Sequence, residues 1–265
     1  MVLKTHQWGS AESPDIVCIH GVGQHGGVFE PLGRHLVGLG HSVVAVDLRG
    51  HGASDREPPW TTDVNAQDVL DTFDSLGIQR AAVVGHSFGG RVAAALAASA
   101  PDRVTRLALL DPGLGVPPER ALKSAEIERL DWSFATVDGA VNALLSSESM
   151  VAPPRDVVEA YVRDDVRKGP DGRYRFRFCP SAAVVAWSEV VLPPPPIADV
   201  PTLFIRASTS ILEGDVQERR YREALDGELT VVSVPHGHNV LWESPDETTE
   251  AIGQFVTVDG DMAGG

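Results

Sequence analysis

The sequence has few cysteines, no excess of basic residues and no long hydrophobic run. Cys18 and Cys179 are the only cysteines among 265 residues, too few for a disulfide framework or a cysteine metal cluster. Asp and Glu outnumber Lys and Arg by 37 to 22, which gives a net charge of -15. This balance argues against nucleic acid or an anionic membrane as a partner. The apolar run 92–100 is far too short to span a bilayer.

The first residues also lack the apolar core of a secretory signal peptide. Together with the scarcity of cysteine, this indicates a protein of the reducing cytoplasm. The expected partner is a small-molecule substrate, with no nucleic acid and no membrane. A chain of this length suits one large α/β domain that carries an insertion.

Apolar runs alternate with stretches of helical spacing along much of the chain. After an edge strand at 2–8, the sequence predicts further strands at 15–20, 42–46, 81–84, 104–110, 201–206 and 229–234. It predicts helices at 29–39, 62–76, 91–100, 216–225 and 245–255. Strands that are apolar on both faces and alternate with helices are typical of a parallel sheet covered on both sides. The fold class is therefore α/β, with a mostly parallel central sheet.

The alternation stops after Gly113 and resumes near residue 200. The intervening stretch predicts helices at 119–130, 137–145, 155–166 and 182–190, followed by a stiff four-proline spacer at 193–196. We interpret this stretch as an inserted helical cap that contacts substrate and excludes water. The expected division is core at 1–112 and 198–258, a helical cap at 113–197 and a flexible tail at 259–265.

The strand at 81–84 leads into Gly85-His86-Ser87-Phe88-Gly89, and a helix follows at once. Strand, sharp turn and helix around G-x-S-x-G form the pattern of a nucleophile elbow, with Ser87 at its apex. His20, Asp47 and Asp111 also follow predicted strands. Because ligands of parallel sheets bind beyond the carboxyl ends of the strands, we expect these polar residues to meet at one edge.

A serine hydroxyl needs a base to take its proton, and that base needs an orienting carboxylate. His238 follows the last predicted strand and is the favoured base, with His236 as the alternative. His86, beside Ser87, is expected to pack. His20 and His51 lie in glycine-flanked turns, where we expect them to brace loops.

Four motifs occur in the order and spacing of a known family: His20-Gly21-Val22-Gly23, Asp47-Leu48-Arg49-Gly50-His51-Gly52-Ala53-Ser54, the elbow, and Gly237-His238. Over about residues 15–112 and 198–256, the chain resembles the α/β-hydrolase fold superfamily. It is similar to the capped serine hydrolases, which include esterases, lactonases and carbon–carbon hydrolases.

The resemblance implies that Ser87 is the nucleophile and His238 the base. It places the oxyanion hole at the N–H groups of Val22 and Phe88. It implies no metal or organic cofactor and structural roles for Asp47 and Arg49. Serine as nucleophile argues against epoxide hydrolysis and dehalogenation by the routes that relatives use.

The triad acid is where the chain departs from the family pattern. Most relatives carry an aspartate after the strand at 201–206, in the position that Ser210 occupies here. A minority carry the acid after the strand that follows the elbow helix, where this chain has Asp111. We favour Asp111, with Asp215 or Glu213 as the alternatives.

The expected reaction is acyl transfer from a small, largely hydrophobic carboxylic ester or lactone through an acyl-enzyme. The alternatives are a carbon–carbon bond hydrolase or lyase on the same triad, and a non-catalytic ligand-binding member of the fold. Apolar residues of the cap are candidates for substrate binding. They are Trp132, Phe134, Leu144 and Trp187.

Overall fold

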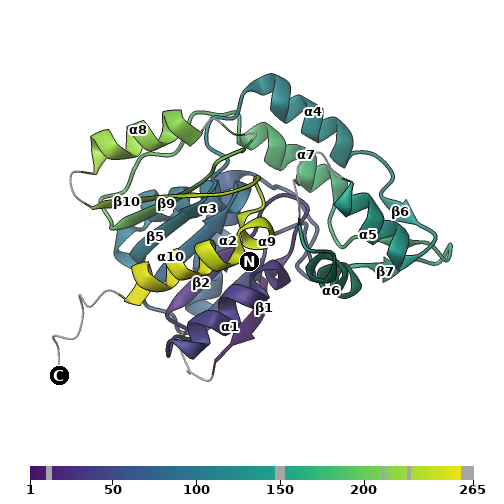
Figure 1. Ribbon diagram of the computed structural model, residues 1–265, viewed down its shortest axis with the longest axis horizontal. Coiled ribbons are helices and arrows are strands. Elements are labelled where there is room, and N and C mark those ends of the chain that lie inside the picture. The colour runs from purple at the N-terminus through teal and green to yellow at the C-terminus, as the bar shows by residue number, and fades with distance from the viewer. Residues whose placement is uncertain (10–13, 147–152, 211, 213, 226–227, 258–265) are drawn as a thin grey trace.

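The computed structural model describes residues 1–9, 14–146, 153–210, 212, 214–225 and 228–257. Its centre is a seven-stranded sheet in the order β1-β3-β2-β4-β5-β9-β10, in which β1 alone runs antiparallel to its neighbour (Figure 1). The strands are β1 (Lys4–Trp8), β2 (Ile16–Ile19), β3 (Val43–Asp47), β4 (Ala81–His86), β5 (Val104–Leu110), β9 (Thr202–Ala207) and β10 (Leu229–Val234). The predicted α/β fold with a mostly parallel sheet is confirmed.

Helices pack on both faces of this sheet, and each face has its own apolar core. On one face lie α1 (Glu30–Gly38), α9 (Val240–Glu243) and α10 (Pro245–Thr257). On the other lie α2 (Thr62–Ser75), α3 (Phe88–Ser99) and α8 (Gly214–Ala224). Every residue of β2, β3 and β4 is buried, because helices cover both sides of the central strands. Two short 3₁₀ helices, η1 (Gly26–Phe29) and η2 (Pro101–Arg103), complete the core.

The chain between β5 and β9 forms a separate group of helices at one end of the sheet (Figure 1). These helices are α4 (Pro118–Glu128), α5 (Val137–Leu145), α6 (Arg155–Asp165) and α7 (Pro180–Glu189). The segment also contains a three-stranded sheet in the order β6-β8-β7 that we did not predict. Its strands, β6 (Ser133–Phe134), β7 (Arg167–Lys168) and β8 (Tyr174–Arg175), have two residues each, too few to show an alternating pattern.

Arg91 of α3 fastens the end of this inserted segment to the core. Its buried guanidinium donates hydrogen bonds to the carbonyl oxygens of Leu192 (3.2 Å) and Pro193 (3.1 Å), and to the hydroxyl of Thr62 (3.0 Å). The backbone N–H of Thr62 in turn donates to the Glu189 carboxylate at 2.7 Å. One buried cation thus joins α2, α3 and the start of the proline spacer.

One short helix was not predicted, and one expectation falls on residues that the structure does not describe. The four-residue helix α9 was not predicted; it lies between the loop after β10 and α10. The tail expected at 259–265 lies outside the described residues. Among the residues that are described, none of the helices has the length and hydropathy needed to cross a bilayer.

Candidate active site

Ser87 lies at a strained turn between β4 and α3. Its φ of 55° falls in the left-handed region, which few residues other than glycine adopt. A Cβ at Gly85 would collide with the carbonyl group of Gly89, and one at Gly89 would collide with the carbonyl oxygen of Ile19. The two glycines therefore allow the tight packing around the serine that the motif predicts.

Ser87, His238 and Asp111 are joined by hydrogen bonds, although they are distant in sequence. Ser87 Oγ lies 2.8 Å from His238 Nε2, and His238 Nδ1 lies 2.6 Å from Asp111 Oδ2. With the proton on Nδ1, the imidazole donates to Asp111 and accepts from the serine hydroxyl. The side chains of His238 and Asp111 are 11% and 2% exposed, so solvent reaches the histidine but hardly the carboxylate.

Asp111 has further donors that hold its carboxylate in place. It follows directly after β5, with a φ of 40°, and its Oδ1 accepts a 3.2 Å hydrogen bond from the backbone N–H of Ala207. Ser210 donates its hydroxyl to Asp111 Oδ2 at 2.5 Å. The residue at the family's usual acid position therefore contacts the acid candidate itself. We did not predict this contact, because nothing local in the sequence relates residues 99 positions apart.

The other acid and base candidates lie elsewhere. Asp215 forms an ion pair with Arg206, and its side chain is 69% exposed. Glu213 lies outside the described residues. His236 has a φ of 67° and is exposed, and its carbonyl oxygen accepts from the hydroxyl of Thr209 at 2.6 Å.

The loop after β2 brings Val22, one of the two predicted oxyanion-hole residues, close to Ser87. A Cβ placed on Gly21 would lie 3.0 Å from Ser87 Cβ, so the loop passes against the nucleophile candidate. Phe88 is the first residue of α3, where backbone N–H groups have no partner within the helix. Within the described chain, neither the N–H of Val22 nor that of Phe88 donates a hydrogen bond.

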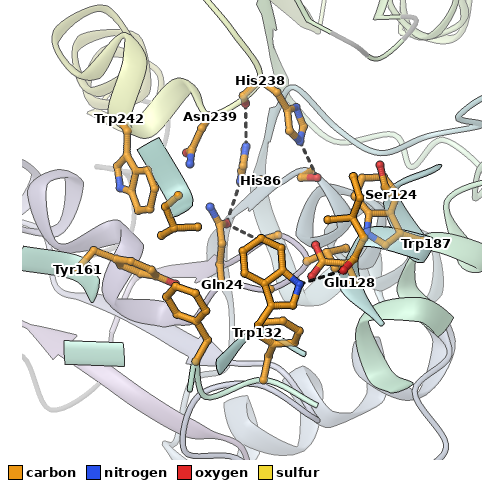
Figure 2. Close-up of a pocket in the computed structure, with 18 of the residues that line it drawn as sticks. Gln24, His86, Ser124, Glu128, Trp132, Tyr161, Trp187, His238, Asn239 and Trp242 are labelled. Atoms are coloured by element: carbon orange, nitrogen blue, oxygen red, sulfur yellow. Dashed lines mark hydrogen bonds between the residues drawn. The ribbon is translucent and has the colours of Figure 1, made fainter. Parts of the chain in front are cut away.

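Gln24 and His86 connect this loop to the histidine, as Figure 2 shows. Gln24 Oε1 accepts from the N–H of Gly21 at 3.0 Å and lies 3.2 Å from His86 Nδ1. His86 Nε2 lies 3.0 Å from the carbonyl oxygen of His238. Burial lowers the pKa of His86 to about 3, so the ring is neutral and donates to only one of these oxygens. Sequence reasoning missed Gln24, which has no motif of its own.

His20 and His51 lie in buried turns that adjoin the site. His20 Nδ1 donates to the carbonyl oxygen of Gly21 at 2.7 Å, and its Nε2 accepts from the N–H of Leu48 at 2.9 Å. Burial lowers the pKa of His20 to about 4 and that of His51 to about 3. The neutral His20 ring thus joins the loops after β2 and β3, whereas His51 Nδ1 lies 3.2 Å from the carbonyl oxygen of Arg49 in its own loop.

Asp47 forms a cluster with His6 and His25 whose ligand atoms lie within 4.8 Å of one another, a spacing that could hold a metal ion. The Asp47 carboxylate, however, already accepts from the N–H groups of Gly26 and Ala53, both at 2.8 Å, and lies 3.0 Å from His6 Nε2. Burial alone would raise the pKa of Asp47, but these hydrogen bonds outweigh it and hold the pKa well below its usual range. The contacts favour a structural brace.

Arg49 is also held by protein contacts. Its guanidinium binds the buried carboxylate of Asp68 through two hydrogen bonds of 2.7 and 2.8 Å. Bidentate pairing of this kind fixes the loop after β3 against α2. The arrangement is consistent with the structural role that we expected for Arg49.

A cavity of about 440 Å³ opens above Ser87, between the core and the inserted segment. Three of the four predicted substrate-binding residues line it: Trp132, Leu144 and Trp187. Phe134 is not among the lining residues; its ring packs edge-on against Phe176, at 5.6 Å between centroids. Lining residues that the sequence did not single out include Gln24, Glu128, Tyr161, Phe176, Phe178 and Trp242. A cavity beside a buried serine suits a small, largely apolar ligand.

Comparison with known proteins agrees with this architecture. The model of the alpha/beta hydrolase fold family matches residues 14–245. Lipase LipV of Mycobacterium tuberculosis is 32% identical over 263 residues, 95% of this chain and 97% of that protein. Esterase YbfF of Escherichia coli is 28% identical over 91% of this chain and 92% of its own length.

A solved structure, that of E-2-(acetamidomethylene)succinate hydrolase, superposes with a TM-score of 0.83 at 26% identity. The superposition covers 96% of this chain and 94% of that one. The family match, the two relatives and the shared fold all span nearly the whole chain. The protein belongs to the α/β-hydrolase fold family.

Proposed function

We propose that this protein is a serine hydrolase that cleaves a small, largely hydrophobic carboxylic ester or lactone. The hydrogen-bonded series Ser87–His238–Asp111 at the base of a cavity carries this proposal. The relationship to a protein named as a lipase and to one named as an esterase supports the ester bond as the target.

In the first half of the reaction, His238 Nε2 takes the proton of Ser87 Oγ while the oxygen attacks the carbonyl carbon. The carbonyl oxygen becomes negative and accepts hydrogen bonds from the N–H groups of Val22 and Phe88. Asp111 stabilises the imidazolium that forms. The C–O bond of the ester then breaks, and the histidine returns its proton to the leaving alkoxide.

In the second half, the same groups act on water. His238 takes a proton from a water molecule whose oxygen attacks the acyl-enzyme, and the same two N–H groups hold the second oxyanion. Collapse of this intermediate breaks the bond to Ser87 Oγ, which regains a proton from the histidine. The products are a carboxylic acid and an alcohol, or a single hydroxy acid when the substrate is a lactone.

The role proposed for residues 113–197 is that of a cap. Its aromatic side chains form much of the cavity wall, and the cavity lies between these helices and the core. Exclusion of bulk water strengthens the hydrogen bonds that stabilise the oxyanion.

Hydrolysis of p-nitrophenyl esters of increasing acyl length tests the proposal. The wild type should hydrolyse short and medium acyl chains, and Ser87→Ala should lose at least about 10³-fold in kcat, since it lacks the nucleophile. Ser99→Ala, at the other end of the same helix, is the matched control and should retain full activity. A wild type as inert as Ser87→Ala on every ester and lactone would contradict the proposal and favour a carbon–carbon substrate or a binding role.

A further inference from the structure

Glu128, the last residue of α4, lines the cavity above Ser87 and has no part in the proposed reaction. A Cβ built on Gly23 would lie 3.8 Å from both of its carboxyl oxygens, so the carboxyl faces the loop after β2. Gly23 adjoins Val22, one of the two proposed oxyanion-hole residues. A substrate that reaches the serine therefore passes close to this carboxyl.

The Glu128 carboxyl has no counter-charge among the residues that the structure describes. Within the described chain, no salt bridge reaches it, whereas Glu126 on the same helix binds Arg129 Nε at 2.6 Å. Burial raises the pKa of Glu128 to about 7. The indole N–H of Trp187 approaches the carboxyl and offsets only part of this effect, without a hydrogen bond of regular geometry. A half-buried carboxyl that lacks a counter-charge gains stability when a ligand supplies one.

Two indole rings lie beside this carboxyl. Figure 2 draws the Glu128 side chain between those of Trp132 and Trp187, and all three line the cavity. Trp132 donates its N–H to the carbonyl oxygen of Ile127 at 2.9 Å, which fixes the orientation of its ring. The faces of indole rings attract cations, and aromatic walls combined with a carboxylate suit an alkylammonium group.

We propose that the cavity selects esters that carry an ammonium group, which binds between the Glu128 carboxylate and the indole rings of Trp132 and Trp187. This inference rests on the proposed function and names the class of its substrate. A neutral ester of the same shape fills the same space but leaves the carboxylate without a counter-charge. An ester with a carboxylate near the scissile bond meets repulsion at this position.

Other charged groups of the cavity act differently on the substrate. Arg120 and Lys123 also belong to α4, but both are exposed and precede Glu128 by eight and five residues. At 1.5 Å of rise per residue, they lie about 12 and 7.5 Å farther along the helix axis. His86 and His238 face the cavity from the core and act on every ester alike. Glu128 is thus the acidic group that distinguishes a cationic from a neutral ester near the serine.

The first test compares butyrylcholine with 3,3-dimethylbutyl butyrate, which has the same shape with carbon in place of the charged nitrogen. The wild type should favour the cationic ester in kcat/KM by at least about tenfold. Glu128→Gln keeps the size of the side chain and removes its charge, so this preference should fall well below that of the wild type and retain only the contribution of the indole rings. Glu126→Gln, on the same helix but paired with Arg129, is the matched control and should keep the wild-type preference.

The pH dependence of the same ratio provides a second readout. Both esters keep their charge between pH 6 and 8. Effects of His238, His86, Arg120 and Lys123 on the acyl-transfer steps that the two esters share cancel in the ratio of their kcat/KM values. The preference of the wild type for the cationic ester should rise through pH 7 as Glu128 ionises. The ratio for Glu128→Gln should stay flat over this range.

Binding separates this inference from the proposed function. Titration of Ser87→Ala with choline in a calorimeter needs no turnover, and Glu128→Gln in the same background should bind at least about tenfold more weakly. Choline binding without hydrolysis of any ester would support the ammonium site and contradict the proposed hydrolysis. Hydrolysis with equal kcat/KM for the two esters, or a preference unchanged in Glu128→Gln, would overturn the inference and leave the proposed hydrolysis standing.

Discussion

At the scale of single residues, the account depends on how Asp111 reaches His238. Asp111 has a φ of 40°, a conformation that aspartate adopts more readily than most residues. The turn aims its carboxylate at His238 Nδ1, and donors from Ala207 and Ser210 fix the orientation. A carboxylate held in this way keeps the imidazole in the tautomer that can accept a proton from Ser87.

We predict that Asp111→Asn lowers kcat for ester hydrolysis by on the order of 10³–10⁴-fold, because an amide favours the wrong histidine tautomer. Asp215→Asn removes an exposed partner of Arg206 and should leave kcat within about twofold of the wild type. Steady-state kinetics on one p-nitrophenyl ester compare the two variants. A large loss in Asp215→Asn with little change in Asp111→Asn would reverse the assignment of the acid.

Ser210→Ala should lower kcat/KM by roughly tenfold, since it removes one hydrogen bond to a charged carboxylate while the histidine remains bound to it. Ser208→Ala, two residues away and exposed, serves as the control. Equal kinetics for Ser210→Ala and the wild type would mean that the 2.5 Å contact contributes nothing to the reaction.

The sequence predicted the roles of those residues that belong to a local sequence motif. Ser87 and His238 follow strands and stand in glycine-flanked turns, and their hydrogen bond was expected from the family motifs. Ser210, Gln24 and Glu128 carry no such pattern. Their contacts join elements that are far apart in the chain, so they follow from the packing of the folded molecule alone.

At the scale of elements, the core strands were predictable and the inserted segment less so. The strand expected at 104–110 agrees with β5, because a run of seven mostly apolar residues between two turns predicts a strand and hardly any other element. The two-residue strands β6, β7 and β8 form because the chain returns on itself, and their sequences show no alternation. Arg91, a single cation within the small-residue helix α3, holds the end of the inserted segment.

Arg91→Met should lower the free energy of unfolding by about 2–4 kcal/mol, because the buried hydroxyl of Thr62 and the carbonyl oxygens of Leu192 and Pro193 lose a charged donor. Arg34→Met is the control: this exposed arginine pairs with Glu30 at the surface, and its loss should cost less than about 1 kcal/mol. Urea denaturation monitored by circular dichroism measures both. A smaller effect at Arg91 than at Arg34 would contradict the anchoring role.

At the scale of the whole molecule, the prediction of an α/β-hydrolase from four short motifs is confirmed. The net charge of -15 is carried by many exposed carboxylates, but a few acidic groups are buried. Asp165, at the end of α6, is one of them. Burial raises its pKa to about 6, and the N–H of Arg177 opposes this only in part.

This shift links Asp165 to the pH dependence of stability. Between the unfolded pKa near 4 and the folded pKa near 6, the folded state holds a proton that the unfolded chain releases. The stabilisation of the folded state by protonated Asp165 is therefore complete below about pH 4 and is lost as the pH rises to about 6.

Asp165→Asn should consequently have nearly the wild-type free energy of unfolding at pH 4 and exceed it by about 2–3 kcal/mol at pH 8. Asp164→Asn is the matched control, because Asp164 is 59% exposed and should show a small difference at both values. Urea titrations at the two pH values supply the comparison. A constant gap between Asp165→Asn and the wild type would show that Asp165 does not titrate as described.

The most direct test of the central claim is the mass of the intact protein after treatment with a fluorophosphonate, which reacts with activated serines. The account predicts one adduct per chain, on the peptide that contains Ser87. It also predicts no adduct in Ser87→Ala and a greatly slowed reaction in Asp111→Asn. Wild-type protein that stays unlabelled, or labelling that persists in Ser87→Ala, would contradict an activated nucleophile at the elbow.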